Sequence, residues 1–594
     1  MGTNDYQFKV NLGGMIELLS GHLYSSPNVF VRELLQNCTD AIHARIDRDS
    51  SFDPKTAVVE IEVTENEQIL FRDNGTGLTE EEIHRFLAVI GQSSKFDIEK
   101  GRAEGDYIGR FGIGLLSCFM VTDTIIVRTV SYRTPDTTLE WRGQSDGTYT
   151  ITELPDKRPA GTEIILRRNA QTAQAEAAEY YHADEISNLV YYYGLFLQYP
   201  VYLVAGAERT RLNLQMKLDA EKNKSLCLKM GKMFLGDDFL DCFNLVSSDG
   251  LFSGIAYVLP CPVSAGAHHM HRIYLKNMLL TENGDKLLPE WAFFIRCIIH
   301  TDKLTPTSSR EDFYEDELLE QAGEEIAQCI GNYLESLELH NDSLLYEIVR
   351  IHHLAVKSVI ASDDSVSDIL LPYIVFQTTL GEMTGRELMD FGSDACYTTD
   401  VNQFRQLAPL YAQRSQLLIN AGYVYDDKII RKMSERSTDT CIEMLTDTDI
   451  DLLLNDTDME EEAGAFIKEA ETILRKYDCR LSLKEFLPDD IPTLYTINTN
   501  AYHSRQIKRS KETANAVFSE MLSSFEDSFR SGAKACLYFN TNNLVVRKLI
   551  TSPITDKTKA CIEILYVNAL LSGHFPLLNH EMKTLNDNLY TLML

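Results

Sequence analysis

Residues 31–41 read VRELLQNCTDA, and this stretch decides how the amino-terminal part of the chain is interpreted. It lies within a segment of helical periodicity that extends from residue 30 to 46. Glu33, Asn37 and Asp40 recur at intervals of four and three residues, so they project from one face of the predicted helix. Two acids and an amide beside apolar packing are costly unless they have partners. The stripe is therefore either an exposed polar face or part of a site that holds a magnesium ion and a water molecule.

A second segment, FRDNGTGLT at residues 71–79, places an acid and two glycines directly after a predicted strand. The carboxylate of Asp73 can accept a hydrogen bond from the exocyclic amine of a purine. Gly75 and Gly77 have no Cβ, so the backbone beside the acid can approach a ring closely. The same composition is common in plain turns, which is the alternative interpretation.

A third segment, YIGRFGIGLLSCFMV at residues 107–121, carries Gly109, Gly112 and Gly114 before an apolar run. A glycine-rich loop that leads into a helix presents backbone N–H groups and a positive dipole end to phosphate. Its spacing is that of neither a dinucleotide fingerprint nor a Walker loop. Residues 91–108, which precede this loop, are polar and poor in apolar anchors, as is typical of a mobile flap. A hydroxyl residue, Thr162, opens a later predicted strand.

The strand patterns predict an α+β fold in which helices cover one face of a mostly antiparallel sheet. The predicted strands of this sheet are 58–63, 69–72, 124–130 and 162–167. A second α/β region follows at about residues 200–440. The last predicted helix carries apolar residues at spacings of four, three, four and three: Leu578, Met582, Leu585, Leu589 and Leu592. This stripe packs either onto its own domain or onto a second copy of the chain.

Composition limits the classes of function. The chain has 594 residues, 56 Lys and Arg against 88 Asp and Glu, and a formal charge of −32. This balance argues against a broad basic surface that grips nucleic acid. The twelve cysteines are scattered singly, and the first residues show no export signal, so we expect a cytoplasmic protein with reduced thiols and no membrane span.

Taken in order, the three segments and the Gly161-Thr162 pair resemble the GHKL ATPases, a group that includes gyrase, histidine kinases, mismatch-repair proteins and the heat-shock protein 90 chaperones. The match is closest to the heat-shock protein 90 family of the bacterial, high-temperature protein G type. Three stretches carry it, namely FKVNLGGMIELLSGHLYSSPNVFVRELLQNCTDA at residues 8–41, LLPEWAFFIRCIIHTDKLTPTSSRED at residues 287–312 and CLYFNTNNLVVRKLI at residues 536–550.

The resemblance implies three domains. An N-terminal GHKL α/β sandwich that binds ATP would occupy residues 1–175, with a lid at about 91–115. An α/β middle domain carrying a catalytic-arginine loop would occupy 176–455. A mixed α/β dimerisation domain would occupy 456–594. The protein would then be a homodimeric, stress-responsive chaperone that hydrolyses ATP, binds partly folded client proteins, and binds neither nucleic acid nor membrane.

The resemblance also implies roles for single residues. Glu33 would activate the attacking water, and Arg310 would reach the γ-phosphate from the middle domain. Asn37 would complete the Mg²⁺ shell together with the phosphates. Asp73, supported by Gly77 and Thr162, would hold the adenine amine. Asp40 would line the pocket, and Gly109, Gly112 and Gly114 would wrap the phosphates.

Several positions depart from the family pattern. Ala44 and Gln92 stand where many members carry lysine, and Thr307 and Tyr314 stand where the middle-domain loop often carries amides. These changes bear on the hydrolysis rate more than on nucleotide binding. Two alternatives therefore stay open. One is a nucleotide-sensing scaffold that hydrolyses ATP slowly or not at all, and the other is a DNA-linked GHKL ATPase of the gyrase or mismatch-repair kind.

Overall fold

The structure is a computed structural model, and it describes residues 26–65, 67–87, 96–97, 102–103, 114–168, 179–214, 218–264, 266–267, 269–307, 311–364, 366–436, 441–446, 450, 453–513 and 535–594. Contacts divide the chain into two compact units, Met1–Ser336 and Leu337–Leu594. None of the helices in these ranges is long and apolar enough to cross a membrane.

The first unit begins with an eight-stranded sheet in the order β10-β9-β1-β2-β8-β5-β6-β7. Neighbouring strands are antiparallel except β1 and β9, which run parallel. The predicted antiparallel sheet is therefore confirmed, with strand ends shifted by no more than one residue. The strands are β1 (Val59–Thr64), β2 (Gln68–Asp73), β5 (Thr124–Val130), β6 (Thr138–Gln144), β7 (Tyr149–Leu154), β8 (Gly161–Arg167), β9 (Val201–Ala205) and β10 (Glu208–Arg211).

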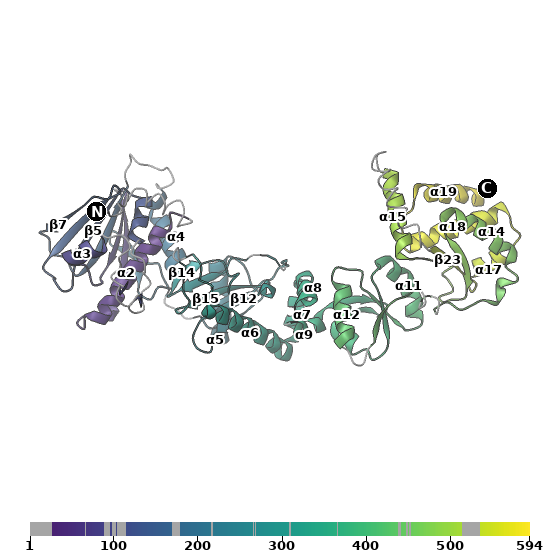
Figure 1. Cartoon of the computed structure of the whole chain (residues 1–594), viewed down its shortest axis with the longest axis horizontal. Helices are drawn as coiled ribbons and strands as arrows, with labels where there is room; N and C mark the ends of the chain where they lie inside the picture. Colours follow the sequence, from purple (N-terminus) through teal and green to yellow (C-terminus); the bar gives the residue numbers. More distant parts are fainter. Residues whose placement is uncertain are drawn as a thin grey trace, which may run out of the picture. The chain divides into compact units, whose positions relative to one another are not determined.

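Helices cover one face of this sheet (Figure 1). The predicted helix is α2 (Val29–Arg48), which packs with α4 (Ala183–Gly194) and the 3-10 helix η3 (Gly114–Met120) over a shared apolar core. A short helix, α3 (Glu80–Phe86), follows β2, and a capping box at Thr79 and Glu82 fixes its start. The glycine segment thus leads into a 3-10 helix rather than the α-helix that its apolar run suggested.

The sheet continues past residue 175, where the sequence placed the first domain boundary. β9 pairs with β1 from Val59 and Val201 onward, and β10 closes that edge. This parallel pairing joins segments about 140 residues apart, and no local pattern records it. The division into three domains stays a prediction.

The rest of the first unit is built on a five-stranded sheet in the order β11-β12-β15-β13-β14. A long helix, α6 (Glu317–His340), follows it and contains the boundary between the two units. The other elements are α5 (Ala220–Leu235), β11 (Asp241–Val246), β12 (Ser253–Val258), β13 (Arg272–Leu275), β14 (Met278–Thr281) and β15 (Ile295–Thr301).

The second unit contains two further sheets. The first has the order β17-β16-β19-β18-β20, and the second is a three-stranded sheet in the order β21-β23-β22. The first sheet and its helices are α7 (Asp342–Ile351), α8 (His353–Ser362), α9 (Ser367–Leu370), β16 (Val375–Thr378), β17 (Gly381–Thr384), α10 (Gly385–Met389), β18 (Ala395–Thr398), α11 (Val401–Gln413), β19 (Leu417–Asn420), α12 (Asp426–Arg436) and β20 (Ile442–Met444).

The three-stranded sheet packs with helices into a separate apolar core. Its elements are α14 (Gly464–Leu474), η8 (Arg475–Tyr477), β21 (Arg480–Lys484), β22 (Thr493–Ile497), α15 (Thr499–Thr513), β23 (Ala535–Asn540), α17 (Leu544–Thr551), α18 (Asp556–Ser572) and α19 (Asn579–Met593). Mixed α and β structure through both units confirms the predicted fold class.

Candidate functional site

The polar stripe of α2 is buried. Only 4% of Glu33 and 3% of Asp40 is exposed, and Asn37 is half-buried. The exposed-face interpretation is therefore wrong for both acids. The apolar residues of α2 anchor it to the sheet, and this packing carries the acids inward with them. A buried carboxylate requires charged or hydrogen-bonding partners, so this stripe has the character of a site.

Glu33 lies between a cation and a glycine. The guanidinium of Arg32 is 3.3 Å from its Oε1, and both side chains are almost fully buried. On the other side, a Cβ added at Gly114 would lie only 2.4 Å from its Oε2. Any side chain at Gly114 would displace the carboxylate, so the glycine lets the start of η3 approach Glu33 closely.

Asp73 stands at the end of β2, where several donors converge on its carboxylate. The N–H of Gly75 donates to its Oδ1 at 2.8 Å, and the thiol of Cys38 and the N–H of Thr162 also donate to it. Burial raises the pKa of Asp73 to about 7, although these donors and the charge of Arg45 act in the opposite direction. The carboxyl group is therefore poised between its two protonation states near neutral pH.

Glycines bring the turn after β2 against its neighbours. A Cβ at Gly75 would lie 2.5 Å from the carbonyl carbon of Ala41 on α2. Gly77 has a φ of +60°, and a Cβ there would lie 1.9 Å from the carbonyl oxygen of Val130. The turn is thus wedged between α2 and β5, and residues with a Cβ would force it outward.

Thr162 joins this cluster through the strand register. It pairs with Asp73 of β2 and with Thr129 of β5, and the hydroxyl groups of the two threonines are 3.2 Å apart. The hydroxyl of Thr129 also accepts a hydrogen bond from the N–H of Leu78 at 2.8 Å. Three strands and one helix therefore hold the Asp73 carboxylate in place.

The structure places the predicted site residues in separate groups: Glu33 lies against Gly114, and Asp73 pairs with Thr162 at the turn that contains Gly77. Asp40 faces a cavity of about 170 Å³ that Tyr199 and Asn277 also line. Gly109, Gly112 and Arg310 lie outside the described residues, as do Gln92 and most of the predicted lid. Ala44 is buried on α2, and half of the Tyr314 side chain is exposed.

Sequence reasoning missed three contributors: Arg32, Cys38 and Thr129. Arg32 directly precedes Glu33 in the sequence, and an ion pair between adjacent residues follows no helical spacing that would have marked it. Cys38, Ala41 and Arg45 form a second stripe on α2, at intervals of three and four, that faces the Asp73 turn. The spacing could be read from the sequence, but the sequence did not indicate that these residues contact the Asp73 turn. The contact of Thr129 depends on strand register alone.

Residues 24–165 match the family described as histidine kinase-, DNA gyrase B- and HSP90-like ATPase. This segment is an ATPase domain of that family. Glu33, Asn37, Asp73, Gly114 and Thr162 all lie in the ATPase domain.

The chain is also similar to several bacterial chaperones. It is 26% identical to chaperone protein HtpG of Chlorobium luteolum over 64% of this chain and 63% of the relative. It is 28% identical to that of Chlorobium chlorochromatii over 52% and 51%, and 27% identical to that of Clostridium perfringens over 57% and 60%. The aligned region thus spans between half and two thirds of these relatives. The resemblance to bacterial heat-shock protein 90 chaperones is confirmed.

The described residues offer few ligands for a metal ion. Within the described ranges, no group of three or more His, Cys, Asp or Glu side chains is arranged to hold a metal ion. The amide of Asn37 offers one oxygen ligand on the ATPase-domain helix. This fits Mg²⁺ that arrives with nucleotide, because Mg²⁺ in such sites takes one or two protein ligands and completes its shell with phosphates and water.

Proposed function

We propose that this protein is an ATP-dependent cytoplasmic chaperone of the heat-shock protein 90 type, which binds and remodels partly folded proteins. The observation that carries the proposal is the Asp73 cluster. A carboxylate is fixed at a strand end by Gly75, Cys38 and Thr162, next to a helix whose Glu33 is buried against Gly114. This combination suits a purine at one end and phosphates at the other.

Each residue then has a defined task. Asp73 accepts the hydrogen bond of the adenine amine, and Thr162 and the Gly77 turn hold it in position. Asn37 supplies an oxygen to Mg²⁺. Gly109, Gly112 and Gly114 present backbone N–H groups to the phosphates, and Asp40 lines the pocket from the same helix as Glu33 and Asn37. Bound Mg·ATP supplies the phosphoanhydride bond that water cleaves.

Glu33 positions and deprotonates the attacking water in this proposal. Its hydrogen bonds with Arg32 are 3.3 Å long, and the start of η3 lies against its other carboxylate oxygen at Gly114. Arg310 approaches the terminal phosphate and stabilises the charge that develops there. Hydrolysis then depends on the arrival of a residue from outside the ATPase domain.

The C-terminal helix supports a homodimer. Within the chain, α19 buries Leu578 at its start and packs Leu585 against the core, but Met582 and Leu589 are 51% and 43% exposed. Two further residues of this helix, Tyr590 and Met593, are 67% and 82% exposed. An apolar helix surface that its own domain leaves open suits a twin copy.

The test is ATP binding and steady-state hydrolysis by the wild type, Glu33→Ala and Arg310→Ala, with molecular mass measured on the same samples. We expect a dimer, retained ATP binding in both variants, and turnover lost in Glu33→Ala and slowed in Arg310→Ala. Suppression of aggregation of a denatured model protein tests the chaperone step. Unchanged hydrolysis in both variants would exclude the mechanism. Stimulation of hydrolysis by DNA at physiological salt would favour a DNA-linked ATPase instead.

A nucleotide-sensing scaffold is the second candidate. Two observations favour it: Ala44 is buried at a position where many relatives carry lysine, and Arg32 engages Glu33. A scaffold would bind ATP and change conformation, but its turnover would equal that of Glu33→Ala. The same hydrolysis assay therefore separates the two candidates.

A further inference from the structure

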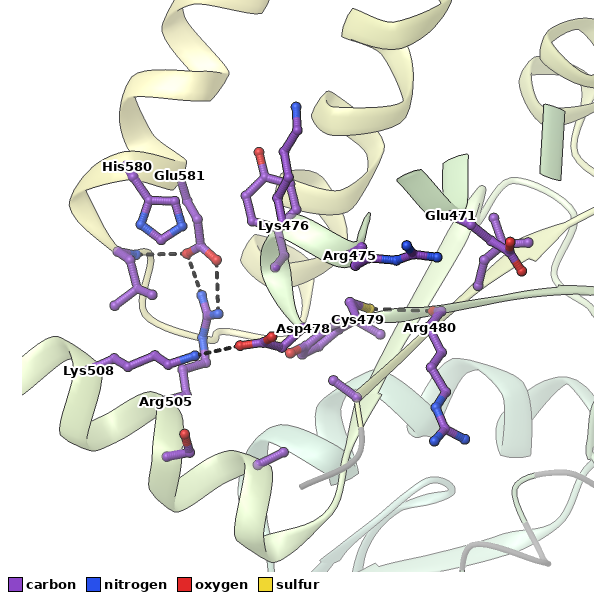
Figure 2. Close-up of a pocket in the computed structure, with 17 residues that line it drawn as sticks. Glu471, Arg475, Lys476, Asp478, Cys479, Arg480, Arg505, Lys508, His580 and Glu581 are labelled. Carbon is purple, nitrogen blue, oxygen red and sulfur yellow. Dashed lines mark hydrogen bonds and ion pairs between the residues drawn. The ribbon is translucent and has the colours of Figure 1, made fainter. Parts of the chain in front are cut away.

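A cavity of about 600 Å³ opens in the second unit, far along the sequence from the ATPase domain. Its walls come from η8, the start of β21, α15 and the first turn of α19 (Figure 2). The volume falls within the usual range for binding pockets, which is roughly 300–1,000 Å³. None of the residues that surround it has a role in the proposed ATPase.

The charge of this cavity is opposite to that of the protein. Five lining residues are Lys or Arg and three are Asp or Glu, so the lining carries 5 − 3 = +2 before His580 is counted. The whole chain carries −32. A concave surface that concentrates positive charge within an acidic protein attracts anions. The lining residues that carry charge are Arg475, Lys476, Arg480, Arg505, Lys508, Glu471, Asp478 and Glu581.

Two of the five cations, Arg505 and Lys508, form ion pairs with acids of the same lining. Arg505 forms two hydrogen bonds with Glu581, at 2.9 and 2.5 Å, and both side chains are buried. Lys508 binds Asp478 at 2.9 Å. These pairs shape the wall, and they leave little charge for a ligand.

The other three cations, Arg475, Lys476 and Arg480, form the rim of the cavity and are exposed. In the part of the chain that the structure describes, the guanidinium groups of Arg475 and Arg480 make no hydrogen bond or ion pair, and both residues are exposed. Lys476 lies 3.5 Å from Glu563, with 63% of its side chain exposed. Exposed arginines of this kind can bind carboxylate or phosphate oxygens in a bidentate manner.

The arrangement of these cations indicates the shape of the ligand. In Figure 2, the side chain of Lys476 extends upward, that of Arg480 extends downward, and Arg475 lies between them in height. Cations that point in different directions suit a ligand that carries several separated negative groups. An extended polypeptide is such a ligand, because its successive side chains point to opposite faces. β21, which contributes Arg480 and Leu481, is an edge strand that pairs along its length only with β23 among the described strands. Such an edge can accept backbone hydrogen bonds from an added strand.

The cavity is less suited to a nucleotide. Tyr477, the ring nearest to the rim cations in sequence, is stacked on Tyr566 at 4.4 Å and on His580 at 5.9 Å between ring centroids. Tyr477 is already engaged in two stacking contacts, so it is a poor platform for a base. We propose that this cavity is a docking site for an extended, acidic polypeptide segment whose carboxylates contact Arg475, Lys476 and Arg480. The proposal does not depend on ATP hydrolysis.

The test uses the full-length chain without nucleotide. The protein is titrated into a fluorescent peptide of about eight residues in which Glu and Thr alternate, and binding is followed by anisotropy. A peptide in which Lys replaces each Glu is the control. We expect the acidic peptide to bind at least about tenfold more tightly, and its affinity to fall as salt rises. Equal binding of both peptides would overturn the proposal.

Substitutions locate the site. The double variant Arg475→Ala/Arg480→Ala removes two exposed cations and should weaken binding of the acidic peptide by about tenfold. The control Arg350→Ala/Arg405→Ala removes two other exposed arginines of the same unit and should leave binding unchanged. Glu471→Gln removes a lining acid and should strengthen binding.

Two results would contradict the assignment. If both double variants bind the acidic peptide equally, the cavity is not the site. If a single-stranded oligonucleotide of equal charge displaces the peptide at the same concentration, the site recognises polyanions in general rather than an acidic polypeptide. Thermal unfolding of each variant verifies that the exposed substitutions leave the fold intact.

Discussion

Two buried glutamates, Glu33 on α2 and Glu581 on α19, have almost the same exposure, at 4% and 1%, and both face an arginine. Their surroundings differ. Glu581 accepts hydrogen bonds from both terminal nitrogens of Arg505, from the hydroxyl of Tyr566 at 2.9 Å and from the N–H of Leu578 at 2.8 Å. Glu33 receives hydrogen bonds of 3.3 Å from its neighbour Arg32 and is flanked by a glycine.

The comparison sets an acid that stabilises the fold beside the proposed general base of the ATPase. A carboxylate held by four short hydrogen bonds is fully satisfied, and it stabilises the junction of α15, α18 and α19. Glu33, by contrast, lies where the start of η3 approaches α2 at Gly114, and its ion pair with Arg32 is longer, at 3.3 Å. Burial alone therefore does not distinguish the proposed general base from an acid that only stabilises the fold.

The largest expected effect comes from Glu581→Gln. The amide keeps the shape of the side chain but turns one acceptor into a donor that faces donors. We expect the second unit to lose about 3 kcal/mol of its free energy of unfolding, which is the typical loss when one partner of a buried ion pair is removed. Denaturant titration followed by circular dichroism measures this. Tyr566→Phe, which removes one of the four bonds, should cost about 1 kcal/mol.

The matched change in the first unit is Glu33→Gln, which should affect turnover more than the free energy of unfolding. We expect turnover to fall by about 100-fold, because the proposed general base is lost, and the free energy of unfolding to fall by less than in Glu581→Gln, because the ion pair with Arg32 is the longer of the two. Hydrolysis and denaturant titration on the same preparation report the two quantities. A loss of stability as large as that of Glu581→Gln would remove the distinction between the two acids.

A third acid, Asp73, sharpens the comparison through pH. Its pKa of about 7 means that it becomes protonated as the pH falls from 8 to 6, and the neutral group accepts a hydrogen bond from the adenine amine less well. Affinity for adenosine should therefore fall with pH, by up to about tenfold for each unit below the pKa. Adenosine is the appropriate probe because it has no phosphate that titrates in this range. Asp73→Asn should bind it with no such dependence.

The smallest expected effect is that of Cys38→Ala. Removal of the thiol takes away one donor that stabilises the ionised carboxylate, so the pKa of Asp73 should rise and the midpoint of adenosine binding should move to higher pH. Cys38→Ser supplies a donor again and should return the midpoint toward that of the wild type. An unchanged midpoint in Cys38→Ala would show that the thiol does not act on the carboxylate.

Much of the fold could be predicted from local pattern. The helical period over residues 30–46 predicted α2, and alternation predicted strands at the places where β1, β2, β5 and β8 lie. The repeat of apolar residues predicted α19. Each of these signals is contained in one short segment, because backbone periodicity places neighbouring side chains on a common face.

The tertiary structure decided the rest. It joined β9 to β1 and aligned Thr162 with both Asp73 and Thr129, since strand register depends on segments that are distant in sequence. It turned Cys38 toward Asp73, and it left Met582 and Leu589 exposed while burying Leu578. The sequence named the residue types that a nucleotide site requires. Only the packing of α2 on the sheet determined which of those residues meet, because contacts between distant segments are set by the shared core rather than by local pattern.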